Sequence, residues 1–407
     1  MAGNGLPQRI DRRLYRFADK LARPLSDSRR REFIGDMIPG LVISGHVHLT
    51  KVARAVSTGD ERIHGVEKRL SGHLASEHWD ASFLADELLR RSAQMITDDS
   101  LIAADLTDLS KPYAKKLEGL GRVHDGSRPE KTITSGYMVF EAFVRVGRWQ
   151  LFPLIVELLK TYSGAPTGEN AEILQHVLAI HQAAQGKGTW VLDRGFDREE
   201  LMLPFLRHRL AFVIRQRGDR HVVLPNGRRI AQTEIAEELK ATSWPKSSKR
   251  SKRWPKTGRT ATQEVTLPNV PEEKLLLVAH WRRPSSEPLL LLVSPAARRA
   301  PRRGRWFVEA YLRRWGVEDA TRGLKQQFRL EGFLVRGWRS IRRLLWLVAW
   351  SFFWLNLWGE ERYAELRKAL LEHPWRVAKE AVYLFNAIAM QIQYLLHPKP
   401  KLEIVTT

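Results

Sequence analysis

Two short apolar runs in this sequence each end on an aspartate. The run "SLIAAD" ends on Asp105, and the run "GTWVLD" ends on Asp193. Each run is typical of a short buried strand. Open α/β sheets bind their ligands at the carboxyl ends of strands. Both aspartates are therefore expected where a sheet of this kind places its functional site.

Neighbouring segments supply the rest of such a sheet. Strands are predicted at 137–146, 149–159 and 210–217, and helices at 168–184 and 197–209. The order βββαβαβ predicts a mixed α/β fold with helices packed against the sheet. Asp108 is interpreted as a turn residue and stays the alternative to Asp105. Asp197 is interpreted as an acid in the first turn of a helix, beside Asp193.

The pattern changes on both sides of this core. Residues 1–95 carry apolar residues at three- and four-residue spacing, which predicts a helical DNA-binding region. Short strands predict a β-rich insertion at 218–300, after the first part of the core at 96–217. Residues 301–360 are expected to be helical and to complete the core. A C-terminal helix and a tail are expected at 361–407.

Charge gives the first indication of a partner. The 407 residues hold 67 lysines and arginines and 45 aspartates and glutamates, a net charge of +22. Such an excess is typical of chains that bind nucleic acid or an anionic membrane surface. A basic loop at 244–259 contains no acid, and Trp244 and Trp254 favour nucleic acid over a solvated linker because aromatic rings stack on bases. The loop residues expected to contact DNA are Lys249, Arg250, Lys252 and Arg253.

One apolar run resembles a membrane span. Residues 344–359 carry Trp346, Trp350, Trp354 and Trp358 at four-residue intervals. The run is shorter than the roughly 20 apolar residues that a spanning helix needs, and Asn356 interrupts it. A buried core helix is therefore expected, and no membrane partner.

Cysteine usage and the N-terminus bear on the compartment. The chain has no cysteine, which excludes disulfides, zinc fingers and thiol catalysis and fits a reducing cytoplasm. The first residues lack the apolar stretch of a signal peptide. A cytoplasmic location is expected.

The segment "YLRRWGVEDATRGLK" at 311–325 combines an acid with several cations. A helix turns about 100° per residue, which places Tyr311, Arg314, Glu318 and Lys325 within roughly 60° of one face, together with Arg322. Apolar stripes face cores, and solvent faces mix charges without order. One acid among a phenol and cations is therefore a candidate functional face, with an ordinary basic helix as the alternative. Asp319 points about 100° away and is the weaker candidate.

The two strand-end aspartates give Glu318 possible partners. Phosphodiester chemistry with two metal ions needs carboxylates that converge from different elements. Hard oxygen ligands suit Mg²⁺, and Mn²⁺ can substitute for it. Asp105, Asp193 and Glu318 would come from two strands and a helix, with cationic neighbours to hold DNA phosphates.

These residues resemble the bacterial insertion-sequence transposases of the DDE class. Tyr311, Arg314, Glu318 and Lys325 match that family's Tyr-x2-Arg-x3-Glu-x6-Lys signature. The stretches "IAADLTDLSKPYAKKLEGLGRVHDGS" and "WVLDRGFD" are similar to the blocks around its first and second aspartates. The resemblance covers roughly residues 40–350. It implies an RNase H-like catalytic domain interrupted by a β-rich insertion.

The resemblance also implies an activity and residue roles. The activity is cut-and-paste transposition: strand cleavage at terminal inverted repeats, then transfer of the freed 3′-hydroxyl to target DNA. It implies two Mg²⁺ ions on Asp105, Asp193 and Glu318, a homodimer in a synaptic complex, and action on the bacterial nucleoid. Tyr311, Arg314 and Lys325 would contact phosphates. Arg215 in "FVIRQR" is similar to another DNA-contacting arginine of this branch.

One position departs from the family pattern. Members can carry a tryptophan on the last insertion strand that stabilises a flipped base. The comparable strand here, "PLLLLVS", is aliphatic, and Trp281 before it is the candidate substitute.

Three other functions compete with transposition. An RNase H-like nuclease or junction resolvase would use similar carboxylates but needs neither the basic insertion nor the Tyr/Arg/Lys face. A DNA-binding protein derived from a transposase would need no intact acid set. A peripheral membrane protein rests on charge and the tryptophan stripe alone.

Overall fold

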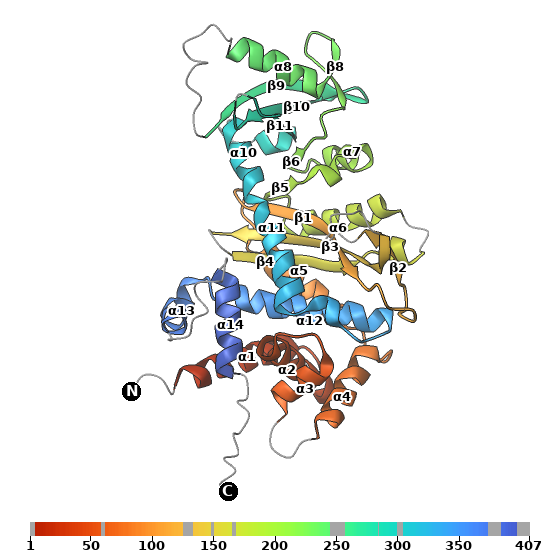
Figure 1. The fold of residues 1–407 in the computed structure, drawn as a ribbon, viewed down its shortest axis with the longest axis vertical. Coiled ribbons are helices and arrows are strands. Elements are labelled where there is room, and N and C mark those ends of the chain that lie inside the picture. The colour runs from red at the N-terminus through yellow and green to blue at the C-terminus, as the bar shows by residue number, and fades with distance from the viewer. Residues whose placement is uncertain are drawn as a thin grey trace.

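The computed structural model describes residues 5–57, 62–124, 133–147, 150–164, 168–244, 257–283, 285–298, 304–372 and 384–396. The molecule is elongated, with N-terminal helices at one end, a sheet in the middle and the insertion at the other end (Figure 1). The basic residues predicted to contact DNA from the insertion loop lie outside the described residues, as does the tail after residue 396. These residues are Lys249, Arg250, Lys252 and Arg253.

The central sheet has the expected mixed α/β topology. Its strands are β1 (Leu101–Ser110), β3 (Ile133–Val146), β4 (Gln150–Leu158), β5 (Thr189–Leu192) and β6 (Phe212–Arg215). β3 pairs antiparallel with β1 and with β4, while β5 is parallel to β1 and β6 is parallel to β5. The order β4-β3-β1-β5-β6 forms the mixed sheet of the core. The structure adds a short strand, β2 (Gly121–His124), paired with β3.

Alternation along the inner strands defines the two faces of the sheet. Trp190 and Leu192 face the main core, where α6 (Glu169–Ala183) and α7 (Glu199–Arg207) pack. Val191 belongs to a second core beneath α10 (Gly304–Arg313). Because successive strand residues point to opposite faces, each strand contributes side chains to both cores. The α10 face is the one that carries the candidate site.

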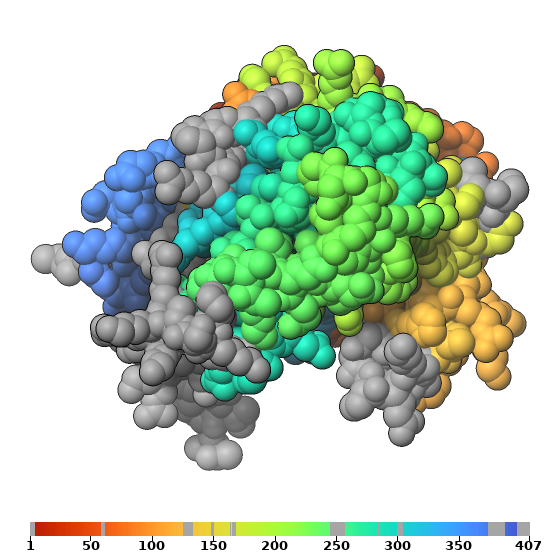
Figure 2. Space-filling view, turned by 90° about the horizontal axis from the view of Figure 1, so that it is seen from above, coloured from red at the N-terminus to blue at the C-terminus, as the bar shows by residue number. Residues whose placement is uncertain are grey.

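The insertion continues the sheet. Its strands are β7 (His221–Val223), β8 (Arg229–Ala231), β9 (Arg259–Leu267), β10 (Val270–Trp281) and β11 (Leu289–Val293). β11 pairs antiparallel with β6, so the insertion strands extend the core sheet edge to edge. The helix α8 (Gln232–Ser243) and the strand β8 were not expected from the sequence. Figure 2 shows the insertion, in green, covering this end of the molecule.

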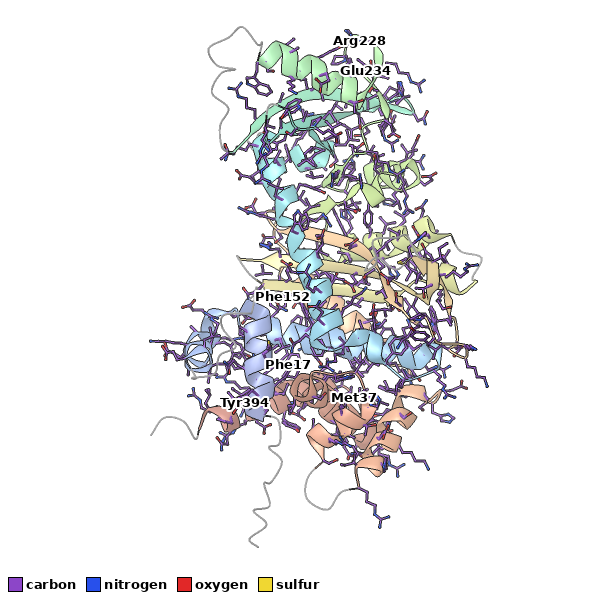
Figure 3. The ribbon with its side chains drawn as sticks, viewed as in Figure 1. Phe17, Met37, Phe152, Arg228, Glu234 and Tyr394 are labelled. Atoms are coloured by element: carbon purple, nitrogen blue, oxygen red, sulfur yellow. The ribbon has the colours of Figure 1, made fainter. Side chains whose placement is uncertain are left out.

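The N-terminal region is helical, as predicted. Its helices are α1 (Leu6–Ala22), α2 (Ser28–Ser44), α3 (Leu49–Val56), α4 (Ile63–Ala75) and α5 (Phe83–Ala93). They pack around α12 (Trp338–Leu357), whose residues from Leu344 to Leu357 are all buried. Phe17 of α1 and Phe152 of β4 both contact Phe353 of α12, with ring centroids 6.3 and 5.0 Å away (Figure 3). The α12 helix therefore joins the N-terminal helices to the sheet.

The tryptophan stripe faces the protein interior. Trp350, Trp354 and Trp358 have no exposed surface, and Trp346 is 5% exposed. None of the helices in the described part of the chain is long and apolar enough to cross a membrane. The prediction that this run forms a buried core helix is confirmed.

The segment expected as one helix at 305–328 is three pieces. α10 ends at Arg313, α11 (Trp315–Arg322) follows, and a π-helical turn spans Gly323–Gln327. At the junction, the amide of Arg314 donates to Tyr311, and the amide of Val317 donates to Arg314. These three-residue bonds tighten the turn and re-aim the helix there. The residues predicted to share one face of a continuous helix are therefore divided between α10 and α11, with Arg314 at the junction.

The C-terminal part contains two described helices. These are α13 (Ala364–Leu371), which was not expected, and α14 (Leu384–Leu396), which covers the second half of the predicted C-terminal helix. Residues 373–383 lie outside the description. Short 3₁₀ turns occur at Lys160–Ser163, Arg194–Phe196, Pro295–Arg298, Leu330–Gly332 and Glu361–Tyr363.

Candidate active site

Asp105 and Asp193 lie level with each other on neighbouring parallel strands. The register pairs Ala103 of β1 with Val191 of β5. Two residues further along each strand come Asp105 and Asp193, just past the end of the pairing. Residues in register on parallel strands point to the same face of a sheet. The two carboxylates therefore lie side by side. Asp193 follows the end of β5, as predicted, but Asp105 lies within β1, which continues to Ser110, so the prediction that Asp105 ends its strand is wrong.

The same row continues into the strands on either side. Glu141 of β3 is the cross-strand partner of Asp105. On the other side, Leu192 of β5 pairs with Ile214 of β6. The next residues on the two chain segments are Asp193 and Arg215, so Arg215, the last residue of β6, lies beside Asp193. The row Glu141, Asp105, Asp193, Arg215 thus crosses four strands in spatial order. Sequence analysis had selected three of these four residues.

Local hydrogen bonds fix the two aspartates. Asp193 Oδ1 accepts a bond from the Gly195 amide at 2.8 Å and so caps the 3₁₀ turn that follows β5. Asp105 Oδ1 accepts a bond from the amide of Leu106 at 2.9 Å. Each bond engages only one carboxylate oxygen. The second oxygen of each aspartate is therefore left for another ligand within the described contacts.

Glu318 approaches this row from above, on α11. Gly316 allows the close approach, because a Cβ there would lie 2.7 Å from Arg145 Nη2 and 3.2 Å from Leu151 Cδ1. Val317 and Ala320 are buried against the sheet side. One turn before Glu318, Arg314 directs its Nη2 to Glu318 Oε1 at 2.9 Å. The helix thus brings one acid and one cation over the two aspartates.

Asp105 is affected by its burial and by the charges of the neighbouring acids. The pKa of Asp105 rises to about 6, first because burial removes water from the carboxylate, and then because Asp193 repels its charge. Glu318 acts in the same direction, while Arg314 and the Leu106 amide oppose the rise. A pKa raised by neighbouring carboxylates indicates a site with too little positive charge for its acids.

Arg314 is the cation at the centre of this group. Burial disfavours its charge, but Tyr311, Asp105, Asp193 and Glu318 together raise its pKa. Arg314 is 7% exposed, and its Nε has no hydrogen-bond partner among the described residues. The open Nε donor of this buried guanidinium is suited to bind an anionic group.

The other members of the predicted face have different surroundings. Tyr311 is 3% exposed and packs in the core beneath α10, with the Arg314 guanidinium 5.7 Å from its ring centre. Lys325 Nζ lies 3.5 Å from both Asp108 Oδ1 and Glu331 Oε1. Arg322 is exposed. Solvent exposure along this face therefore increases from the buried Tyr311 to the exposed Arg322.

The alternative acids have other partners. Asp108 pairs with Lys325 and accepts a bond from the Ser110 hydroxyl at 2.7 Å. Asp197 is buried and forms an ion pair with Arg220 at 2.8 Å. Asp319 acts on Arg145 instead of on the aspartates. These contacts favour Asp105 and Asp193 over their neighbours as the open carboxylates.

Trp281 does not fit the role predicted for it. The residue ends β10 with no exposed surface, packed with Ala236 of α8 and Leu290 of β11. Its ring meets Trp244 edge to face at 5.6 Å. A base could reach this ring only by displacing the core of the insertion. The expectation of Trp281 as a base-stacking residue is therefore corrected: its aromatic surface stabilises the fold.

Sequence analysis missed two residues beside the site. Glu141 is fully buried in the row, and its position follows from strand register, which the sequence pattern does not reveal. Trp315 follows Arg314 directly and is 58% exposed, an unusual exposure for a large aromatic side chain. Trp315 lies within the segment 311–325 that carries Glu318, so its position in the sequence could have marked it as a candidate site residue.

The donor chemistry of the site suits a hard divalent cation. Carboxylate oxygens from two strands and a helix are the ligands that Mg²⁺ prefers. Across the described residues, no three His, Cys, Asp or Glu side chains are grouped so as to hold an ion as they stand. Glu318 is instead engaged by the ion pair with Arg314.

Comparison with known families identifies the domain. Residues 162–354 match the family model of the transposase DDE domain. The DDE domain match includes Asp193, Glu318 and the whole insertion, and it starts after β4, so Asp105 lies outside it.

Among solved structures, the chain is similar to the piggyBac transposase, described as a synaptic complex with hairpin DNA, at 12% identity and a TM-score of 0.45. The alignment covers 96% of this chain and 80% of that chain. No curated protein matches the sequence.

Proposed function

We propose that this protein is a DDE transposase that cuts DNA at the ends of a mobile element and joins those ends to target DNA. The observation that carries the proposal is the row of Asp105 and Asp193 beneath Glu318, within and beside a DDE domain. The net charge of +22 supports a DNA substrate. A homodimer acting on two inverted repeats in a synaptic complex is part of the proposal.

Asp105, Asp193 and Glu318 are proposed to hold two Mg²⁺ ions, with Mn²⁺ as a substitute. When bound, the ions supply Lewis-acid activation of the attacking and leaving oxygens of a phosphodiester. Asp105 and Asp193 fix the position of the site on rigid strands, and Glu318 closes it from the helix. Release of Glu318 from Arg314 frees a guanidinium for a DNA phosphate.

Cations around the acids are proposed to hold the DNA backbone. Arg314 and Arg215 flank the carboxylate row on the α10 side of the sheet, and Lys325 and Arg322 continue along the helix. Tyr311 contributes its hydroxyl from a buried ring. Trp315 offers an exposed aromatic surface beside the cleavage point, where a base can stack.

The reaction has two phosphoryl transfers. In the first, a water oxygen forms a new bond to phosphorus, and the 3′-oxygen of the neighbouring nucleotide leaves as a hydroxyl. In the second, this 3′-hydroxyl forms a bond to a target phosphorus, and the target's own 3′-oxygen leaves with a proton. Both steps need the scissile phosphate held still between the acids and the cations.

The test is cleavage of a supercoiled plasmid that carries the DNA segments flanking the gene in its source genome. Asp105→Asn, Asp193→Asn and Glu318→Gln should abolish Mg²⁺-dependent cleavage and leave binding of the same DNA intact. Asp319→Asn on the same helix is the matched control and should cleave like the wild type. Loss of cleavage in Asp108→Asn, with Asp105→Asn active, would move the ligand to the alternative aspartate.

A second assay separates transposition from simple hydrolysis. A duplex with a pre-cut 3′-end should join to plasmid DNA when the wild-type protein and Mg²⁺ are present. Cleavage without joining would favour an RNase H-like nuclease or resolvase. Tight DNA binding without cleavage or joining would favour a DNA-binding protein derived from a transposase.

A further inference from the structure

Glu141 is a fully buried carboxylate that the proposed ligand set does not use. It sits on β3 between Phe140 and Ala142, both of which also have no exposed surface. Its Oε2 accepts a hydrogen bond from the Thr321 hydroxyl at 2.6 Å. Its Oε1 is buried without a hydrogen-bond partner among the described residues. Burying a carboxylate with an open oxygen costs free energy that an apolar residue would not cost.

The position of Glu141 links the two halves of the site. In the strand register, Glu141 lies directly opposite Asp105. On the helix, Thr321 lies three residues after Glu318 and so shares its face. The Thr321–Glu141 hydrogen bond therefore connects the helix that carries Glu318 to the strand residue opposite Asp105.

The helix that carries Glu318 has few other fixed points. α11 is 8 residues long, begins at a tightened turn and ends in a π-helical turn. Its apolar contacts through Val317 and Ala320 hold it near the sheet but are not directional. A hydrogen bond constrains both distance and rotation. The bond to Thr321 is thus suited to set the rotation of the helix about its axis.

We propose that Glu141 is a positioning residue: by accepting the Thr321 hydroxyl, it holds α11 in the rotation that turns Glu318 toward Asp105 and Asp193. The inference rests on the proposed function, because it concerns the same carboxylate set. It assigns no metal to Glu141. The burial of Glu141 and its bond to Thr321 place it behind the ligands.

Thr321→Val is the sharpest variant, because it removes the hydroxyl and keeps the shape of the side chain. We expect it to weaken Mn²⁺ binding, measured by electron paramagnetic resonance of free Mn²⁺, by about 10- to 100-fold. Thr321→Ser should keep wild-type affinity because it retains the hydroxyl. Glu141→Gln should also keep it, because an amide oxygen can still accept the bond.

Two controls separate positioning from folding. Ser351→Ala removes a fully buried hydroxyl, which donates to Leu347 of α12 away from the site, and should leave Mn²⁺ affinity unchanged. Thermal unfolding of every variant reports the folded fraction. If Thr321→Val does not fold, Thr321→Ala combined with Glu141→Leu, which removes both partners, provides the comparison and should show the same loss of affinity.

Three results would overturn the inference. Wild-type Mn²⁺ affinity in Thr321→Val would show that the bond does not set the site. Loss of affinity in Glu141→Gln equal to that in Asp105→Asn would make Glu141 a ligand. A wild-type protein that binds no Mn²⁺ would remove the site that the bond is proposed to position.

Cleavage measured in the same variants keeps this inference apart from the proposed function. If the wild type cleaves and Asp105→Asn does not, the proposed function stands whatever Thr321→Val does. If the wild type binds Mn²⁺ but cleaves no DNA, the proposed function fails, and the affinity of Thr321→Val still decides the role of Glu141.

Discussion

Arg314 Nη2 lies 2.9 Å from Glu318 Oε1, and the same guanidinium acts on Asp105 and Asp193. One buried cation therefore serves three acids that come from two strands and a helix. The pKa of Asp105 stays near 6 because Arg314 opposes the rise that burial and the other acids cause. The pH dependence of the site thus depends on this arginine.

Replacing Arg314 should move that pH dependence in a defined direction. Arg314→Ala removes an influence that lowers the pKa of Asp105, so the pKa should rise further above about 6. A carboxylate must be ionised to hold a cation. The acidic limb of the cleavage profile should therefore shift to higher pH, while Arg314→Lys should shift it less. Pre-steady-state cleavage rates between pH 5 and 9 measure the effect. Arg313→Ala, at an exposed position next to Arg314, is the control, and an unshifted limb in Arg314→Ala would contradict the assignment.

The two aspartates could be selected from sequence because each follows a short apolar run. The structure places them level, with Asp193 just after β5, while β1 continues past Asp105 to Ser110 because its later residues pair with β3. Glu141 could not be found in this way. Its place opposite Asp105 depends on the register of β1 against β3, which are joined by a long connection through residues 111–132. A slip of one residue would turn Glu141 to the other face.

Trp281 shows a second limit of sequence analysis. Trp281 was selected because it precedes the aliphatic strand, but its ring is covered by α8, a helix that the sequence pattern did not reveal. The break at Arg314 is a third case. Helical periodicity continues across it, while three-residue hydrogen bonds turn the chain. The burial of Trp281 and the helix break at Arg314 both depend on tertiary packing, which local sequence propensity does not determine.

Glu141→Gln should change the pH dependence of stability. Burial raises the pKa of Glu141 to about 7 in the folded protein, from an ordinary value of 4.5. Ionisation is therefore unfavourable in the folded state, and the wild type loses stability relative to the Gln variant as the pH rises from 4.5 to 7. The loss is complete above pH 7 and reaches at most about 3 kcal/mol. Urea unfolding at pH 5 and pH 8 measures the difference. Glu272→Gln, at an exposed position of β10, is the control.

Lys325→Ala should weaken DNA binding through the phosphate backbone. The lysine already lies near Asp108 and Glu331, each at 3.5 Å, so DNA must compete with two carboxylates for its charge. Loss of one phosphate contact should reduce the slope of log K against log salt by about 1. Fluorescence anisotropy between 50 and 300 mM salt, as rough working limits, measures the slope. Lys274→Ala, on an exposed side chain of the insertion, is the matched control. A slope equal to that of the wild type would make Lys325 a structural lysine.

Two tryptophans should respond in opposite ways to removal. Trp281 has no exposed surface, so Trp281→Ala leaves a cavity and should cost about 3 to 5 kcal/mol of stability. Trp315 is 58% exposed, so Trp315→Ala should change stability by no more than about 0.5 kcal/mol.

If Trp315 stacks on a base beside the cleavage point, its removal should weaken binding of terminal DNA by about 1 to 3 kcal/mol, and Trp315→Phe should restore much of it. Leu312→Ala, a half-exposed apolar side chain on the preceding helix, controls for loss of apolar surface. Chemical denaturation and anisotropy on the same preparations distinguish the two effects. A DNA defect in Trp281→Ala under conditions where it is folded, with none in Trp315→Ala, would reverse the two roles.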